Sequence, residues 1–95
     1  MKKSKPDRFK SVWDALADTP EEAANLRVRA ELMDKIIHLI ASNGWTQADA
    51  AIHCKVTQPR INDLIRGKIA RFSLDALVNI AAALGQHVHV ELEAV

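Results

Sequence analysis

Residues 46–67 read TQADAAIHCKVTQPRINDLIRG, and this stretch decides the fold. It holds two short amphipathic segments, and the small side chains of Ala50 and Ala51 let a second helix cross the first closely. Ile52 and Val56 are expected to fill the corner between the two segments. The pattern predicts two short helices that share one core and are joined by a tight turn.

The second of these helices has clear end signals. Thr57 is a good N-cap, Pro59 falls in the first turn, where a missing N–H costs little, and Gly67 supplies the left-handed residue that ends a helix. The helix between them is about ten residues long, which is the length of a recognition helix lying in a DNA major groove. Its apolar residues, expected to face inward, are Ile61, Leu64 and Ile65.

Polar side chains occupy the opposite face of this helix. Few of them help the chain to fold, so the face is available for a ligand. Arginine matches guanine, asparagine and glutamine match adenine, and aspartate accepts from cytosine. The residues expected to contact base edges are Gln58, Arg60, Asn62 and Asp63.

Charge is distributed unevenly along a chain whose net charge is only +1. Residues 55–71 carry five basic side chains against the single acidic Asp63, whereas the first third is largely acidic after its N-terminal lysines. A solvated helix surface can carry such charges without any partner, so the charge supports nucleic-acid binding only together with the helix pattern. The basic residues expected to hold phosphates are Lys55, Arg66, Lys68 and Arg71.

The two-helix unit resembles the lambda-repressor and Cro type of helix-turn-helix, often called the XRE family. The matching residues are Thr46, Gln47, Ala51, Val56, Thr57, Gln58, Ile61, Arg66 and Gly67. In that family the glutamine of the first helix contacts a phosphate and the glutamine opening the second helix reads a base, which the resemblance assigns to Gln47 and Gln58. The family usually has glycine where this chain has Lys55, so a residue with a side chain must adopt positive φ at a cost of about 1 kcal/mol.

A longer string narrows the resemblance. Residues 58–68 (QPRINDLIRGK) followed by residues 71–75 (RFSLD) look like a subgroup of small proteins, many of which are antitoxins of HigA-like toxin–antitoxin pairs. This resemblance implies a repressor of its own operon, with double-stranded operator DNA and a toxin as partners and no cofactor. A phage-type or metabolic regulator without a toxin is the alternative within DNA binding, and a protein-interaction module that does not touch DNA is the alternative outside it.

Two further helices flank the unit. Thr19, Pro20 and Glu22 form a strong helix start, with Glu22 completing a capping box, and the helix is expected to run to about Asn43. Ser73 is expected to cap a helix over residues 74–84, stapled to the core by the preceding Phe72. The buried residues expected on the first are Leu26, Ala30, Met33, Ile37 and Ile40, with Ile36 beside them; those on the second are Leu77, Val78, Ala81 and Leu84.

Residues 87–93 (HVHVELE) change to a period of two, which predicts a strand. Its apolar face, expected to form a dimer interface, is made of Val88, Val90 and Leu92. A strand without a partner in its own chain exposes unpaired backbone groups, and pairing with a second copy would give a two-fold dimer that reads two half-sites. The strand could instead pair with residues 9–13 of its own chain or with a toxin.

The 95 residues have room for one domain. We expect a flexible basic segment at 1–11, a helix-turn-helix domain at 12–86 and the strand at 87–95. The predicted fold class is all-α, a lambda-repressor-like domain of four to five helices with a C-terminal β-strand used in dimerisation. With no apolar run of about eighteen residues, no signal-peptide core and a single cysteine, the chain is expected to be cytoplasmic and nucleoid-associated, with no membrane partner.

No catalytic or metal-binding constellation is apparent in the sequence. His87 and His89 with Glu91 could hold a metal only with a further ligand, and a polar solvent face is the simpler interpretation. His53 and Cys54 have no third group to orient a base, so Cys54 is interpreted as a small core residue. We expect neither enzymatic activity nor a metal site.

Overall fold

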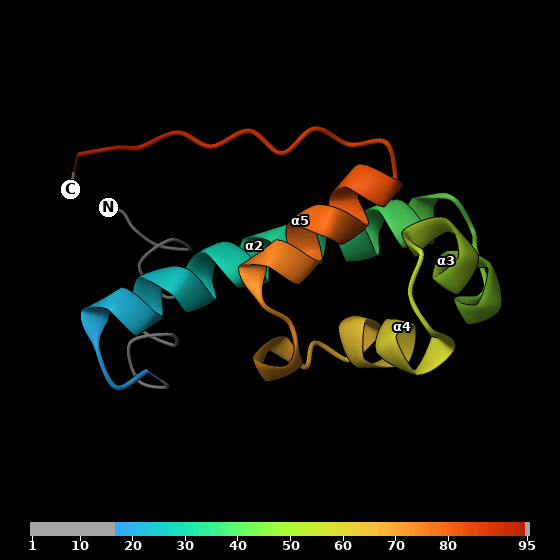
Figure 1. Cartoon of the computed structure of the whole chain (residues 1–95), viewed down its shortest axis with the longest axis horizontal. Helices are drawn as coiled ribbons and strands as arrows, with labels where there is room; N and C mark the ends of the chain where they lie inside the picture. Colours follow the sequence, from blue (N-terminus) through green and yellow to red (C-terminus); the bar gives the residue numbers. More distant parts are fainter. Residues whose placement is uncertain (1–16, 95) are drawn as a thin grey trace, which may run out of the picture.

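The structure, a computed structural model, describes residues 17–94. The predicted basic segment at 1–11 and residues 9–13, named above as an alternative partner of the C-terminal strand, lie outside the described residues. The helices are α2 (Pro20–Ser42), α3 (Gln47–Cys54), α4 (Gln58–Ile65) and α5 (Leu74–Ala83), with a short 3-10 helix, η1 (Ile69–Arg71), between the last two. Figure 1 shows α2 running the length of the molecule, α5 lying along it, and α3 and α4 following at its C-terminal end.

Local capping starts each of the four α-helices within residues 17–94, and the caps at Thr19, Thr57 and Ser73 are the predicted ones. The hydroxyls of Thr19, Thr46, Thr57 and Ser73 each accept a hydrogen bond from a backbone N–H of the first turn. At α3 the capping box is complete, because Asp49 also accepts from the Thr46 N–H at 3.3 Å. At α2 the predicted box differs in detail: the Glu22 carboxylate accepts from the Asp18 N–H at 3.0 Å and not from Thr19.

The core lies where α2, α4 and α5 meet, closed by α3. Its buried side chains are Met33, Ile36, Ile40, Ala50, Cys54, Ile61, Leu64, Phe72, Leu77, Ile80 and Ala81. The predicted core roles of Cys54, Phe72 and Leu77 are therefore confirmed. The buried stripe of α2 passes through Ile36 rather than the half-buried Ile37, so the helix is rotated from its predicted orientation.

Three other predictions of burial are wrong. Ile52 is 75 % exposed, because Ala50 and Cys54 turn the opposite face of α3 to the core and Cys54 takes the inner position. Ile65 is 39 % exposed, since Ile61 and Leu64 alone form the buried face of α4. On α5 the core position goes to Ile80, which leaves the predicted Val78 at the surface.

The turn between α3 and α4 has the predicted positive φ. Lys55 adopts φ 59° and ψ 42°, and its N–H caps the end of α3 by donating to the Ile52 carbonyl at 3.3 Å. Val56 then donates to Ala51 at 3.1 Å, which closes the turn. A lysine here carries the steric cost that a glycine avoids.

The predicted C-terminal strand is not formed. Within residues 17–94 no strand is present, and the chain after Gly85 runs back over the molecule as extended backbone (Figure 1). Of the three predicted interface residues, Val88 packs against the core, while Val90 and Leu92 are 75 % and 97 % exposed. A strand requires a ladder partner, and the described residues of this chain supply none.

Truncating a buried and an exposed isoleucine should change the free energy of unfolding by different amounts. Ile61 is fully buried, so Ile61→Ala should lower the free energy of unfolding by about 2–5 kcal/mol. The matched control Ile52→Ala removes the same atoms from an exposed site and should change it by less than about 0.5 kcal/mol. Urea denaturation followed by circular dichroism measures both, and equal losses would contradict the placement of Ile52 at the surface.

Relieving the backbone strain should stabilise the protein. Lys55→Gly should raise the free energy of unfolding by about 0.5–1 kcal/mol, because glycine adopts positive φ without a steric penalty. Lys55→Ala keeps the Cβ and removes the charge, so it should give no such gain. Thermal denaturation should show a higher midpoint for Lys55→Gly only; a similar rise for Lys55→Ala would assign the effect to the charge.

Candidate nucleic-acid interface

The leading end of α4 presents a polar surface on a firmly held helix. Thr57 caps its start, with the Arg60 N–H donating to the Thr57 hydroxyl at 3.3 Å, and Gly67 (φ 71°) follows its end. Ile61 and Leu64 are both fully buried behind it. Gln58 and Pro59 are exposed and Asn62 is half-buried, so the first turn offers an amide side chain to a ligand.

Gln47 and Gln58 occupy equivalent places on successive helices. Each is the first residue after a threonine N-cap, Gln47 half-buried on α3 and Gln58 exposed on α4. Free backbone N–H groups and the positive end of the helix dipole lie at such positions and favour an anion nearby. The predicted phosphate-binding and base-reading glutamines therefore both sit at helix starts.

Arg60 is occupied by contacts within the protein. Its Nη1 donates to the Arg71 carbonyl at 2.8 Å, and its guanidinium carbon lies 4.2 Å from the centre of the buried Phe72 ring. Stacking on an aromatic face and donating to a carbonyl are both favourable for this cation. The side chain ties α4 to the segment that leads into α5.

Asp63 is also paired within the protein. Its carboxylate accepts from Arg71 Nη1 at 3.0 Å, and the Asp63 side chain is only 18 % exposed while that of Arg71 is 58 % exposed. The Asp63 carbonyl accepts from the Lys68 N–H at 3.0 Å. The structure thus brings together Arg60, Asp63 and Arg71, for which the sequence predicts two different kinds of DNA contact.

A second arginine, not predicted from the sequence, holds the same segment. Arg29 of α2 donates through Nη1 to the carbonyls of Ile69, at 3.2 Å, and Phe72, at 3.0 Å, while its Nε donates to Asn25 at 2.6 Å. It lies four residues before Met33, on the face of α2 that enters the core. The sequence does carry a signal for this role. Arg29 is a charged residue on the stripe of α2 that faces the core, and a charged group there needs buried hydrogen-bond partners.

The remaining basic side chains surround the ends of the two helices. Lys55 is exposed at the end of α3, Arg66 is exposed at the end of α4, and Lys68 is half-buried in the following segment. With Arg71 they lie on the stretch that begins at the turn and ends before α5. No side-chain hydrogen bond or ion pair to Lys55, Arg66 or Lys68 occurs within residues 17–94, so their charges are available to phosphates.

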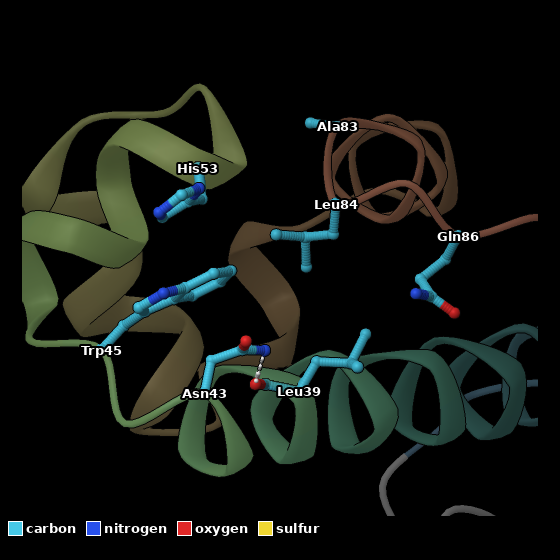
Figure 2. Close-up of a pocket in the computed structure, with 7 residues that line it drawn as sticks. All are labelled: Leu39, Asn43, Trp45, His53, Ala83, Leu84 and Gln86. Carbon is cyan, nitrogen blue, oxygen red and sulfur yellow. Dashed lines mark hydrogen bonds between the residues drawn. The ribbon is translucent and has the colours of Figure 1, made fainter.

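A pocket of about 360 Å³ opens elsewhere, between the ends of α2, α3 and α5 (Figure 2). Trp45 packs on α3 by stacking on His53, with ring centroids 4.0 Å apart and planes 9° apart. The other lining residues are Leu39, Asn43, Ala83, Leu84 and Gln86. The side chain of Asn43 donates to the Leu39 carbonyl at 2.8 Å, as Figure 2 shows. None of the lining residues belongs to α4, so the pocket is not part of its polar surface.

Cys54 is a buried side chain without the environment of a nucleophile. Burial raises the pKa of the Cys54 thiol, which disfavours the thiolate. Among residues 17–94, no three His, Cys, Asp or Glu side chains gather where they could share a metal ion. Within the same residues, no helix is long and apolar enough to cross a membrane.

Comparison with known families agrees with this geometry. Residues 15–93, which are most of the chain, match the model of a family described as a helix-turn-helix domain. No curated protein matches the chain significantly. The helix-turn-helix prediction is confirmed, while the narrower resemblance to HigA-type antitoxins stays a prediction. This chain belongs to the helix-turn-helix domain family, whose fold is that of DNA-binding regulators.

Proposed function

We propose that the protein is a sequence-specific repressor that inserts α4 into the major groove of operator DNA. The observation that carries this proposal is the presentation of α4: its back is fully buried through Ile61 and Leu64, while Gln58 at its leading end is exposed. A recognition helix contacts base edges with its N-terminal residues, so this is the end that must be free.

Within this proposal the four predicted base-reading residues divide into two pairs. Gln58 and Asn62 have no side-chain hydrogen bonds within residues 17–94 and are free to meet base edges. Arg60 and Asp63 would have to give up their contacts with the 71–72 segment before either could reach a base. Their contacts favour a positioning role, in which they fix α4 relative to Arg71.

Phosphate contacts complete the interface. We assign them to the five predicted side chains, Gln47, Lys55, Arg66, Lys68 and Arg71. Asp63 uses one Nη of Arg71, and the guanidinium has further N–H donors and is more than half exposed, so it can hold a phosphate at the same time. Backbone neutralisation of this kind supplies affinity without sequence preference.

The regulatory context is proposed from sequence resemblance. We infer a homodimer that reads two half-sites and represses its own operon as the antitoxin of a toxin–antitoxin pair. Co-expression with the neighbouring open reading frame tests the antitoxin role: a stable complex that relieves growth inhibition would support it. A DNA-binding protein with no such neighbour would instead be a phage-type or metabolic regulator. A protein-interaction module would show no salt-sensitive DNA affinity.

Two alanine variants should separate base reading from phosphate binding. Arg66→Ala should weaken binding to all duplexes and reduce the slope of log K against log salt by about 1, because one phosphate contact is lost. Gln58→Ala should cost about 1–3 kcal/mol on the preferred site and relax preference at one base pair. Gel-shift titrations at two salt concentrations, on a duplex selected from the protein's own promoter and on a scrambled one, measure both; equal loss on both duplexes for Gln58→Ala would remove its base-reading role.

Arg60 should behave as a positioning residue. Arg60→Ala removes a hydrogen bond and a stacking contact, so it should lower the free energy of unfolding by about 1–2 kcal/mol. It should also weaken binding to preferred and scrambled duplexes alike, whereas Arg66→Ala should leave stability within about 0.5 kcal/mol. Changed preference at one base pair with unchanged stability would instead make Arg60 a base-reading residue.

A further inference from the structure

The segment at residues 87–93 is extended, exposed and without backbone partners. Its chain is drawn out over the molecule in Figure 1, and within residues 17–94 no backbone hydrogen bond joins it to another segment. Val88 packs against the core, but Val90 and Leu92 on the same face are 75 % and 97 % exposed. Extended chain with free N–H and carbonyl groups beside apolar side chains is a template for strand pairing.

We propose that this segment pairs antiparallel with the same segment of a second copy, with the two-fold axis passing through Val90. The proposal rests on the homodimer of the proposed function and deepens it by fixing the partner and the register. In this register Val88 lies opposite the partner's Leu92, and Val90 lies opposite the partner's Val90. The apolar side chains of both segments then share one face, the face that Val88 turns toward the core.

Charge complementarity selects this register. With the axis at Val90, His87 lies opposite the partner's Glu93 and His89 lies opposite the partner's Glu91, and symmetry repeats both pairs. Residues directly opposite in an antiparallel pair lie on the same face and interact most strongly. Residues 87–93 of the two copies would form a two-stranded ribbon. Every imidazole therefore meets a carboxylate across this ribbon.

The neighbouring registers lose this match. An axis at Glu91 keeps His89 opposite the partner's Glu93, but it places Glu91 against the partner's Glu91, which is a like-charge pair, and Val88 against the small Ala94. An axis at His89 keeps His87 opposite the partner's Glu91, but it places His89 against the partner's His89, Leu92 against Gln86, and leaves Glu93 without a histidine. A shift by one residue in pairing would set apolar side chains opposite polar ones. The axis at Val90 alone satisfies both faces.

The contact already present in the single chain is consistent with this pairing. His89 Nε2 lies 3.3 Å from Glu91 Oε2 of the same segment, with both side chains more than 70 % exposed. Both groups are thus on the solvent side, where the partner's Glu91 and His89 would arrive. A seven-residue ribbon is marginal by itself, so the attachment of Val88 to each core is required to hold it.

Cross-linking tests the register on the full chain without DNA. Val90→Cys should be joined to a second copy by a short bismaleimide, because the two residues face each other at the axis. Leu92→Cys is the matched control on the same face: its two copies would lie four residues apart, about 13 Å, and should react at least tenfold more slowly. Wild type, whose Cys54 is buried, gives the background. Equal rates at both positions, or no reaction at Val90→Cys, would overturn the register.

Charge substitution tests the pairing itself. His89→Glu should weaken the dimer several-fold, since it sets glutamates opposite one another, and Glu91→His should weaken it less. Mixing the two variants should restore dimers, because each glutamate then meets a histidine of the other chain. Native mass spectrometry should count heterodimers well above their random share. Neither variant keeps the His89–Glu91 contact within its own chain, so that contact cannot cause a preference for heterodimers. A random share of heterodimers would overturn the proposal.

These measurements are independent of DNA binding. Affinity for a duplex carrying a single half-site reports on α4 and should be the same for wild type and His89→Glu. If the cross-link and the heterodimer preference were both absent while the protein still bound the half-site duplex, only the proposed ribbon would be overturned. If Val90→Cys gave a specific cross-link but the protein did not bind DNA, the proposed function would be contradicted and the ribbon supported.

Discussion

The burial of Ile61 and Leu64 fixes the rotation of α4 about its own axis, and the proposed interface depends on that rotation. Both side chains are completely inaccessible, and they lie on one face of an eight-residue helix. Successive residues on a helix are about 100° apart, so two fixed positions determine where every other side chain points. Arg66 is exposed because it lies on the side opposite Ile61 and Leu64, and Gln58 is exposed because it is the first residue of the helix.

The segment after α4 shows how a count of basic residues can overestimate the surface open to nucleic acid. Its carbonyls at positions 69, 71 and 72 have accepted hydrogen bonds from the side chains of Arg29 and Arg60. Loop carbonyls near a core need donors, and two arginines supply them. Their charges serve the fold, while Arg66 and Lys68 keep theirs free. The basic surface is consequently smaller than the sequence suggests.

Helix starts could be predicted from the sequence because capping is local. Thr46 and Asp49 are three residues apart and complete their box without any distant contact. Helix rotation could not be predicted as well, since adjacent apolar residues such as Ile36 and Ile37 differ only in which one the rest of the fold covers. The hydrogen bonds from Arg29 to the carbonyls of Ile69 and Phe72 span 40 and 43 residues, and no local pattern specifies them. Alternation in residues 87–93 describes a preference for extended chain, whereas a strand is a property of two segments.

A weak ribbon is sufficient for the function proposed here. Once one copy occupies its half-site, the second is held nearby by both the ribbon and the duplex, so the two weak associations reinforce each other through effective concentration. A dimer that forms only partly in free solution would then assemble fully on DNA, because binding to two half-sites shifts the association equilibrium by mass action. For the proposed repressor, the same linkage would make repression respond steeply to the amount of protein. Exposure of Val90 and Leu92 in the single chain is therefore compatible with a regulator whose assembly is completed by its operator.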